Sequence, residues 1–328
     1  MAVVAQMMKF PLLLFRGEGF DPNFFYHSGV DIDHSFFLSR PRTLFVPSLN
    51  FTLAKKLFSG KVIRYSSISD GLKPFIKKRK IGIDGRSLSA SAYKKLSSLA
   101  SLQDVSEVLL TSRSRKRKDE IGSISRAVRL TKKILSGLDF GSSQFKTEND
   151  VRKFLLMQTM ELGIEPAYEP IVASGSNSRF PHYQSGNNAR LRAGDGIVLI
   201  DYGVRYKHYC SDLTRCFFLR RGTKAEQTYK KLQDVFVEII DAFPGFGSGK
   251  DLAEFAEKLY KKYRLPLPPH SIGHGIGLDV HEFPRLSKKY KDPLAGTTMA
   301  IEPSAYFETF GVRFEETIYS DGKKARVL

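Results

Sequence analysis

The hydrophobic pattern beyond residue 118 predicts four helices. Residues 119–138 and 223–240 each place their apolar side chains on one stripe, as an amphipathic helix does. Thr147-x-x-Asp150 resembles a capping box, so a helix is expected to begin there, and Thr223-x-x-Glu226 is expected to open another. The predicted helices cover residues 119–138, 147–163, 223–240 and 250–263.

Strand-like segments lie between these helices. They contain runs of apolar and β-branched residues and cover residues 197–204, 209–219, 297–307 and 312–320. Helix pairs that alternate with hairpin-like strand pairs are typical of a curved antiparallel sheet backed by helices. The pattern therefore predicts an α+β domain over residues 119–328.

The first third of the chain has a different pattern. Residues 10–110 contain short apolar runs, such as PLLLF, NFFYHSGV and TLFVP, that Gly, Pro, Asp and Ser interrupt. A helical pattern lies near Ser89–Leu99. These features predict a smaller α/β domain. We interpret the basic run RSRKRK at 113–118 as a charged linker, which gives domains of residues 1–112 and 113–328.

Composition indicates a globular protein without a membrane span. The chain is 41% hydrophobic and 26% charged, which is ordinary for a globular domain. No segment approaches the roughly 20 apolar residues that a bilayer-spanning helix needs. Lys9 and Pro11 interrupt the apolar start of the chain and no small-residue cleavage site follows, so we expect structure there rather than a signal peptide. Cys210 and Cys216 lie in one apparent strand, and two reduced thiols favour a cytoplasmic location.

The net charge of +18 is unevenly distributed along the chain. Residues 1–118 hold 21 Lys and Arg against 8 Asp and Glu, a net of +13, whereas residues 119–328 hold 31 against 26, a net of +5. Such a bias raises the hypothesis of nucleic-acid binding. No zinc finger, helix-turn-helix or RNA-binding aromatic signature accompanies the charge, which favours a solvated basic surface instead.

Four acidic residues follow or interrupt strongly apolar strands. They are Asp201 after IVLI, Asp212 before LTRCFFL, Glu302 after MAI and Glu315 after VRF. A carboxylate in a buried strand is unfavourable unless it is paired, protonated or bound to a metal. One such residue is typically a salt-bridged structural acid. Four in one domain would repel one another, so the pattern predicts bound cations.

A glycine- and histidine-rich loop lies in the same domain. It reads His270-Ser-Ile-Gly-His274-Gly-Ile-Gly and continues to His281-Glu282. Its glycines allow a close backbone approach, and its histidines can reach one site from several directions. A lone histidine would more often be a surface or core residue, but these three accompany the acids.

With these residues in view, the sequence resembles the pita-bread metallopeptidases, which include prolidase, aminopeptidase P and methionine aminopeptidase. The resemblance rests on DYG and SDLTR, GHGIGLDVHE, IEP and GVRFEE in this order, with 212 − 201 = 11 as in the family. It covers residues 119–328 and, more loosely, the N-terminal domain. It implies a pita-bread catalytic domain preceded by a creatinase/prolidase-type domain. Ser304 departs from the pattern, because the family commonly has glycine after IEP.

The resemblance implies five ligands for two divalent metal ions. Asp201 would chelate one ion, Asp212 and Glu315 would bridge both, and His274 and Glu302 would complete the second site. Glu315 is the expected ligand because the family uses the acid directly after Arg and an apolar residue, so Glu316 is not. One histidine with four carboxylates favours manganese, cobalt or iron, and zinc stays an alternative.

The remaining roles concern catalysis and substrate binding. A hydroxide that bridges the metals would attack the scissile carbonyl, and Glu302 is the expected general base and proton shuttle. By resemblance, His182 and His281 act on the tetrahedral intermediate or the departing nitrogen. His270 and Arg313 line the leaving-side pocket, where Arg313 would bind a substrate carboxylate. For each of these four, orienting the metal ligands is the structural alternative.

The expected activity is hydrolysis of Xaa-Pro dipeptides, as in prolidase. The segment 174–195 resembles prolidase and aminopeptidase P rather than methionine aminopeptidase, and creatinase lacks the metal ligands. The compact chain and the interval 315 − 302 = 13 favour prolidase over aminopeptidase P, which acts on longer peptides. A nucleic-acid- or ribosome-binding relative is the alternative of another class, and the intact ligand set disfavours it. The resemblance also implies a homodimer.

Overall fold

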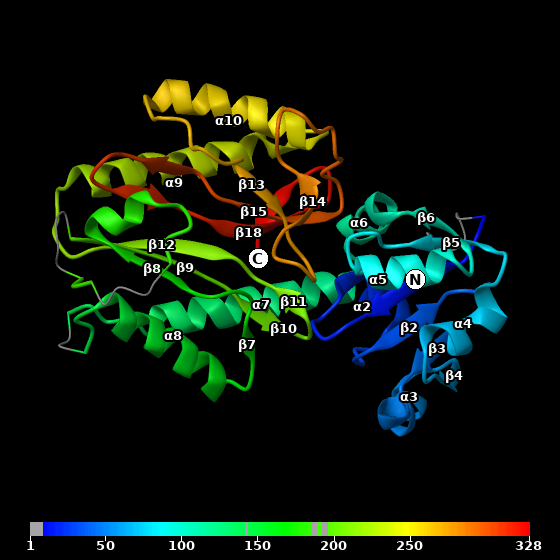
Figure 1. Ribbon diagram of the computed structural model, residues 1–328. Coiled ribbons are helices and arrows are strands. Elements are labelled where there is room, and N and C mark those ends of the chain that lie inside the picture. The colour runs from blue at the N-terminus through cyan, green and yellow to red at the C-terminus, as the bar shows by residue number, and fades with distance from the viewer. Residues whose placement is uncertain (1–8, 142–143, 185–188, 192–195) are drawn as a thin grey trace. The chain divides into compact units, whose positions relative to one another are not determined.

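The computed structural model describes residues 9–141, 144–184, 189–191 and 196–328. The chain forms two compact units, residues 1–113 and 114–328. Figure 1 shows the helices and strands of each unit. Parts of the segment 174–195, namely residues 185–188 and 192–195, lie outside the described residues, as do residues 1–8 of the apolar start.

The N-terminal unit is built on a six-stranded mixed sheet with the order β4-β3-β2-β1-β5-β6. Strands β1 to β3 pair antiparallel, and the outer pairs are parallel. The strands are β1 Leu12–Arg16, β2 Ser35–Leu38, β3 Thr43–Val46, β4 Lys61–Arg64, β5 Lys80–Ile83 and β6 Ser101–Asp104. The helices are α2 Pro22–Ser28, α3 Phe51–Leu57, α4 Ile68–Ile76, α5 Ala90–Ser97 and α6 Ser106–Ser114. The expected α/β character of this region is confirmed.

One apolar run of this unit, NFFYHSGV, is a helix rather than a strand. Asp21 caps α2 by accepting a hydrogen bond from the amide of Phe24 at 2.6 Å, and Pro22 occupies the first turn. Gly29 ends the helix with a φ of 82°. These are standard start and stop signals, and they outweigh the β-forming character of the aromatic residues.

In the described part of the C-terminal unit, all strand pairs are antiparallel. Its larger sheets have the orders β12-β9-β8 and β14-β13-β15-β18-β19, and β11-β10-β7 and β16-β17 are smaller. The strands are β7 Glu165–Pro166, β8 Ile171–Ser174, β9 Ile197–Tyr202, β10 Val204–Tyr206, β11 Tyr209–Cys210, β12 Leu213–Phe218, β13 Gly273–Gly275, β14 Glu282–Arg285, β15 Thr297–Ile301, β16 Ser304–Tyr306, β17 Gly311–Arg313, β18 Glu316–Ser320 and β19 Ala325–Val327.

Four long helices cover these sheets. They are α7 Lys118–Ser136, α8 Glu148–Glu161, α9 Lys224–Ala242 and α10 Gly249–Tyr263, and the four predicted helices are thereby confirmed. Thr147 and Asp150 form the expected capping box, and the hydroxyl of Thr223 accepts from the amide of Glu226 at 3.2 Å. Helices α9 and α10 lie on one side of the sheets and α7 and α8 on the other (Figure 1). The main core lies between α9, α10 and the strands.

The basic run 113–118, which we interpreted as a charged linker, is exposed at Arg115, Arg117 and Lys118 but not throughout. Arg113 lies in α6 and is buried, with 2% of its surface exposed. Arg115 forms a β-bridge with Thr297, and the ammonium of Lys116 donates to Glu282 at 2.7 Å. Lys116 is therefore part of the packing of the C-terminal unit.

Two further expectations from composition concern cysteines and membrane spans. Cys210 and Cys216 are buried free thiols, and they lie on the separate strands β11 and β12 rather than on one strand. Within the described ranges, no helix combines the length and apolar character needed to cross a bilayer.

A buried histidine makes the stability of the N-terminal unit depend on pH. Burial, with a contribution from Arg113, lowers the pKa of His27 from 6.5 to about 4. The unfolded chain then binds a proton that the folded chain does not, so stability is complete above about pH 6.5 and falls as the pH drops toward 4. The loss reaches at most about 3 kcal/mol.

We expect His27→Gln to flatten the decline in the free energy of unfolding between about pH 7 and pH 5. The chain has no tryptophan, so urea unfolding followed by far-UV circular dichroism is the suitable measurement. The exposed His34 provides the control as His34→Asn, because asparagine tolerates its positive φ of 52°. Equal pH slopes for His27→Gln and the wild type would contradict the assignment.

Candidate metal centre

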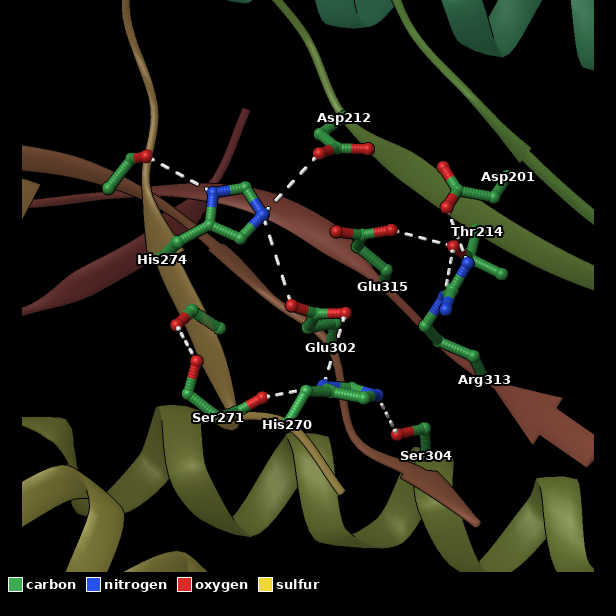
Figure 2. A network of polar contacts seen from close by, with 12 residues as sticks. Asp201, Asp212, Thr214, His270, Ser271, His274, Glu302, Ser304, Arg313 and Glu315 are labelled. Carbon is green, nitrogen blue, oxygen red and sulfur yellow. Dashed lines mark hydrogen bonds and ion pairs between the residues drawn. The ribbon is translucent and has the colours of Figure 1, made fainter. Parts of the chain in front are cut away.

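All nine side chains that the sequence singled out line one pocket of the C-terminal unit, with a volume of about 320 Å3. Figure 2 shows most of them converging from different strands and loops. The predicted ligands are Asp201, Asp212, His274, Glu302 and Glu315, and the predicted catalytic and substrate-binding residues are His182, His270, His281 and Arg313. Segments as distant as residues 182 and 315 therefore meet at one site.

Each acidic residue lies at or near the end of a buried strand. Asp201 is in β9 and pairs in register with Thr214 of β12, and Asp212 directly precedes β12. Glu302 follows β15, and Glu315 separates β17 from β18. Neighbouring antiparallel strands bring these positions together, so the sheets themselves hold the carboxylates in place.

Glycines on both sides of His274 allow β13 to approach its neighbours. A Cβ atom on Gly273 would lie 2.1 Å from the carbonyl oxygen of Ala300, and one on Gly275 would lie 2.2 Å from the backbone of Phe283. The register between β13 and β14 also shifts at His274, as at a β-bulge. Such an irregularity turns a side chain toward a site, which here is the acidic cluster.

The imidazole of His274 presents an unprotonated nitrogen to the acids. Its Nδ1 lies 3.1 Å from the carbonyl oxygen of Gly275, which can only accept, so Nδ1 carries the proton. Nε2 then has a free lone pair, 3.5 Å from Asp212 and 3.9 Å from Glu302. Asp212, His274 and Glu315 each offer a ligand atom within 4.8 Å of one another.

Burial and mutual repulsion oppose ionisation of this cluster. Burial, followed by the charge of Asp201, raises the pKa of Asp212 well above its ordinary value, and burial with the charge of Asp212 does the same for Glu315. Burial raises the pKa of Glu302 to about 7. Divalent cations would remove this penalty, so the donor set of one imidazole and several carboxylates fits them.

Adjacent glutamates have different surroundings. The hydroxyl of Thr214 donates to Glu315 at 2.6 Å, which fixes that carboxylate in the pocket. Glu316 instead pairs with Arg215 and with Lys132. Successive residues of an extended strand point to opposite sides, so Glu315 and not Glu316 lies among the acids.

Asp201 has two partners that do not depend on a metal. Its Oδ2 forms an ion pair with Arg313, and its Oδ1 lies 2.6 Å from the hydroxyl of Tyr168. The same hydroxyl contacts Asp212. Burial acts to lower the pKa of Arg313, but the surrounding carboxylates, Asp201 foremost, raise it above its ordinary value. A charged guanidinium therefore offsets part of the negative charge.

The guanidinium of Arg313 is held on three sides. Besides Asp201, it donates through Nε to Thr214 at 2.9 Å and through Nη1 to the hydroxyl of Tyr306 at 3.0 Å. Only 3% of Arg313 is exposed. Its donors are thus engaged within the site, although it lines the pocket.

Three further histidines lie around the acids, and two of them, His270 and His281, are neutral near pH 7. Burial lowers the pKa of His270 to about 4 and also lowers the pKa of His281. The rings of His274 and His281 lie 4.1 Å apart between centroids. His182 approaches from the segment after β8 and lines the same pocket. The neutral rings of His270 and His281 can donate or accept without adding charge.

Three polar side chains of the site were missed from the sequence. Thr214 was detectable, since it lies two residues beyond Asp212 in the same strand-like segment. Tyr306 follows IEP by three positions, but an aromatic residue in a strand is typically core. Tyr168 gave no signal, because nothing in its neighbourhood indicates a buried hydroxyl between two carboxylates.

Comparison with known proteins extends over both units. The model of metallopeptidase family M24 matches residues 122–321, and the Creatinase/Prolidase N-terminal domain matches residues 12–115. An Xaa-Pro dipeptidase from Pyrococcus furiosus is 30% identical over 284 residues, which cover 84% of this chain and 81% of the relative.

Solved structures match almost the whole chain. A prolidase from Pyrococcus horikoshii has a TM-score of 0.89 at 26% identity, covering 99% of this chain and 96% of that chain. An X-Pro aminopeptidase from Thermotoga maritima has a TM-score of 0.87 at 23% identity, covering 99% and 96%, and this likeness concerns the fold alone. Both likenesses include the sheets that carry the acidic cluster.

The raised pKa of Asp212 determines whether Asp212→Asn stabilises or destabilises the protein. Without metal, a carboxylate whose folded pKa is raised loses stability as the pH rises from its ordinary value through the raised one. Metal-free Asp212→Asn should therefore be more stable than metal-free wild type near pH 7. With divalent metal the order should reverse, because the variant binds metal at least about 100-fold more weakly.

Calorimetric titration with Mn2+ and thermal unfolding with and without it measure both effects. Asp241→Asn is the matched control, because Asp241 is exposed on α9 and does not line the pocket. Equal metal affinity in Asp212→Asn and wild type would exclude Asp212 as a ligand.

Proposed function

Because the chain belongs to metallopeptidase family M24 and carries the Creatinase/Prolidase N-terminal domain, we propose that it hydrolyses the Xaa-Pro bond of dipeptides. The predicted family and the α+β pita-bread fold are confirmed, and the protein is a metal-dependent peptidase. The observation that carries the substrate proposal is the likeness to Xaa-Pro dipeptidases over most of the chain, together with a pocket that contains the predicted site residues.

The metal content is proposed from the donor set. We infer two ions. Asp201 would chelate one of them, and Asp212 and Glu315 would contact both. His274 and Glu302 would complete the other site. Oxygen-rich ligation favours manganese, cobalt or iron, with zinc as the alternative. When bound, these cations polarise the scissile carbonyl and lower the pKa of the attacking water.

Glu302 is proposed to move the proton. Its carboxylate lines the pocket, where it can accept a proton from water and later release it to the departing nitrogen. It also lies between two histidines, with Oε1 3.9 Å from His274 and Oε2 3.8 Å from His270. His182 and His281 are proposed to donate hydrogen bonds to the tetrahedral intermediate or the departing nitrogen.

Arg313 and His270 are proposed to bind the proline side of the substrate. Arg313 forms an ion pair with Asp201. A cation on Asp201 would weaken this pair, which leaves a guanidinium donor for the carboxylate of the dipeptide. His270 lines the same side of the pocket and offers its ring as a wall for the pyrrolidine.

Assembly and location are proposed from the family resemblance. We expect a homodimer in the cytoplasm that acts on small peptides. The excess positive charge of the first third of the chain keeps nucleic-acid binding as the alternative. Binding to generic RNA near physiological salt would favour that alternative, and absence of such binding would count against it.

The length of the substrate distinguishes a dipeptidase from an aminopeptidase. If Arg313 binds the terminal carboxylate, Ala-Pro should be hydrolysed with a kcat/KM about tenfold or more above that of Ala-Pro-Ala. The terminal carboxylate of the tripeptide lies one residue farther from the scissile bond and would miss Arg313. The assay uses manganese-loaded protein, with Asp212→Asn as the control for contaminating peptidases. Faster hydrolysis of Ala-Pro-Ala would identify an aminopeptidase instead.

A further inference from the structure

Both ring nitrogens of His270 have fixed partners. Nδ1 lies 2.8 Å from the carbonyl oxygen of Ser271, and Nε2 lies 3.0 Å from the hydroxyl oxygen of Ser304. Nε2 is also 3.2 Å from the hydroxyl of Tyr306. Figure 2 shows the ring between the carbonyl group on one side and Ser304 on the other.

The carbonyl group determines where the imidazole proton lies. A carbonyl oxygen only accepts, so Nδ1 of His270 must donate to Ser271. A neutral ring has one such proton, which leaves Nε2 as an acceptor. The hydroxyl of Ser304 then donates to Nε2. In the opposite tautomer, the lone pair of Nδ1 would face a lone pair of the carbonyl oxygen of Ser271.

The position of Ser304 is itself tightly fixed. The residue is fully buried, and the hydroxyl of Tyr260 bonds both its amide and its carbonyl oxygen at 2.8 Å. Ser304 is also in register with Arg313 in the hairpin of β16 and β17. These contacts fix the backbone of Ser304, so its short side chain keeps the hydroxyl close to Nε2 of His270.

Tyr306 is the weaker of the two partners of Nε2. Its hydroxyl lies farther from Nε2 than that of Ser304 and also accepts from Arg313 at 3.0 Å. A change in the charge around Arg313 would act on Tyr306 directly. Ser304 lies at the shorter distance from Nε2 and is held by Tyr260 rather than by a charged group, so it is the better anchor for the ring.

We propose that Ser304 is a positioning residue that holds the ring of His270, whose tautomer the carbonyl of Ser271 determines, in one orientation on the leaving side of the active site. It acts through His270, and its effect on hydrolysis rests on the proposed function. Since the family commonly has glycine here, this anchor is a departure from the pattern. Nε2 carries no proton, so His270 contributes to binding and the proton for the leaving nitrogen comes from elsewhere, with Glu302 as the proposed source.

The tautomer can be observed directly. In full-length protein with 15N-labelled histidine at about pH 8, metal-free and loaded with diamagnetic zinc, His270 should show one protonated Nδ1 and one unprotonated Nε2. His270→Gln assigns the signals. Ser304→Ala should leave Nδ1 protonated, because the carbonyl of Ser271 still accepts from it, and should shift the Nε2 signal, because Nε2 loses a hydrogen-bond donor. An unchanged Nε2 signal in Ser304→Ala, or an Nε2–H tautomer in the wild type, would overturn the proposal.

Kinetics test whether the anchor matters for the substrate. Ser304→Ala should raise KM for Ala-Pro by about 3- to 10-fold and change kcat by less than about twofold, as loss of one hydrogen bond predicts. In a His270→Ala background, Ser304→Ala should add nothing further, because it acts through that ring. Additive effects in the double variant would contradict the proposal.

Two controls separate this role from general damage. Ser320→Ala removes another fully buried serine, on β18 and outside the pocket, and should leave KM unchanged. If Ser304→Ala does not fold, Ser304→Gly removes the same hydroxyl and takes the residue common in the family. Absence of Xaa-Pro hydrolysis in the wild type would refute the proposed function alone, since the tautomer measurement does not depend on activity.

Discussion

The repulsion among buried carboxylates is the constraint on which the site depends. Antiparallel strands place Asp212 and Glu315 in the interior, and burial together with neighbouring charge raises both pKa values. A fold that buries several acids in this way is stable at neutral pH only if protons, cations or counter-ions offset them. The ion pair between Asp201 and Arg313 offsets part of the charge, and divalent cations would offset the rest. Metal binding and stability are therefore coupled in this protein.

Uncharged hydroxyl groups complete the site and orient its charged members. Thr214 fixes Glu315, and the hydroxyl of Tyr168 lies between two carboxylates. Ser304 has the same relation to His270. Hydroxyl groups suit this task because they donate to an acceptor without adding charge to a crowded site. The geometry of the ligands thus depends on neutral neighbours as much as on the strands.

The sequence was informative where local rules decide the structure and silent where distant contacts do. Capping signals at Thr147 and Thr223 predicted helix starts, and acids in apolar strands indicated a cluster of carboxylates before any geometry was known. The cap at Asp21 also marks a helix start, although the aromatic residues after it are common in strands. The ion pair of Lys116 with Glu282 and the hydroxyl of Tyr168 join segments far apart in the chain, so composition alone could not reveal them.

Proton release on metal binding tests the coupling most directly. If the acids of the metal-free site hold protons because their pKa values are raised, cations must displace those protons. Calorimetric titration of metal-free protein with Mn2+ near pH 6.5, in two buffers of different ionisation enthalpy, measures their number. We predict release of about one proton or more per chain. Binding without proton release would show that the carboxylates are already ionised, and would contradict the account.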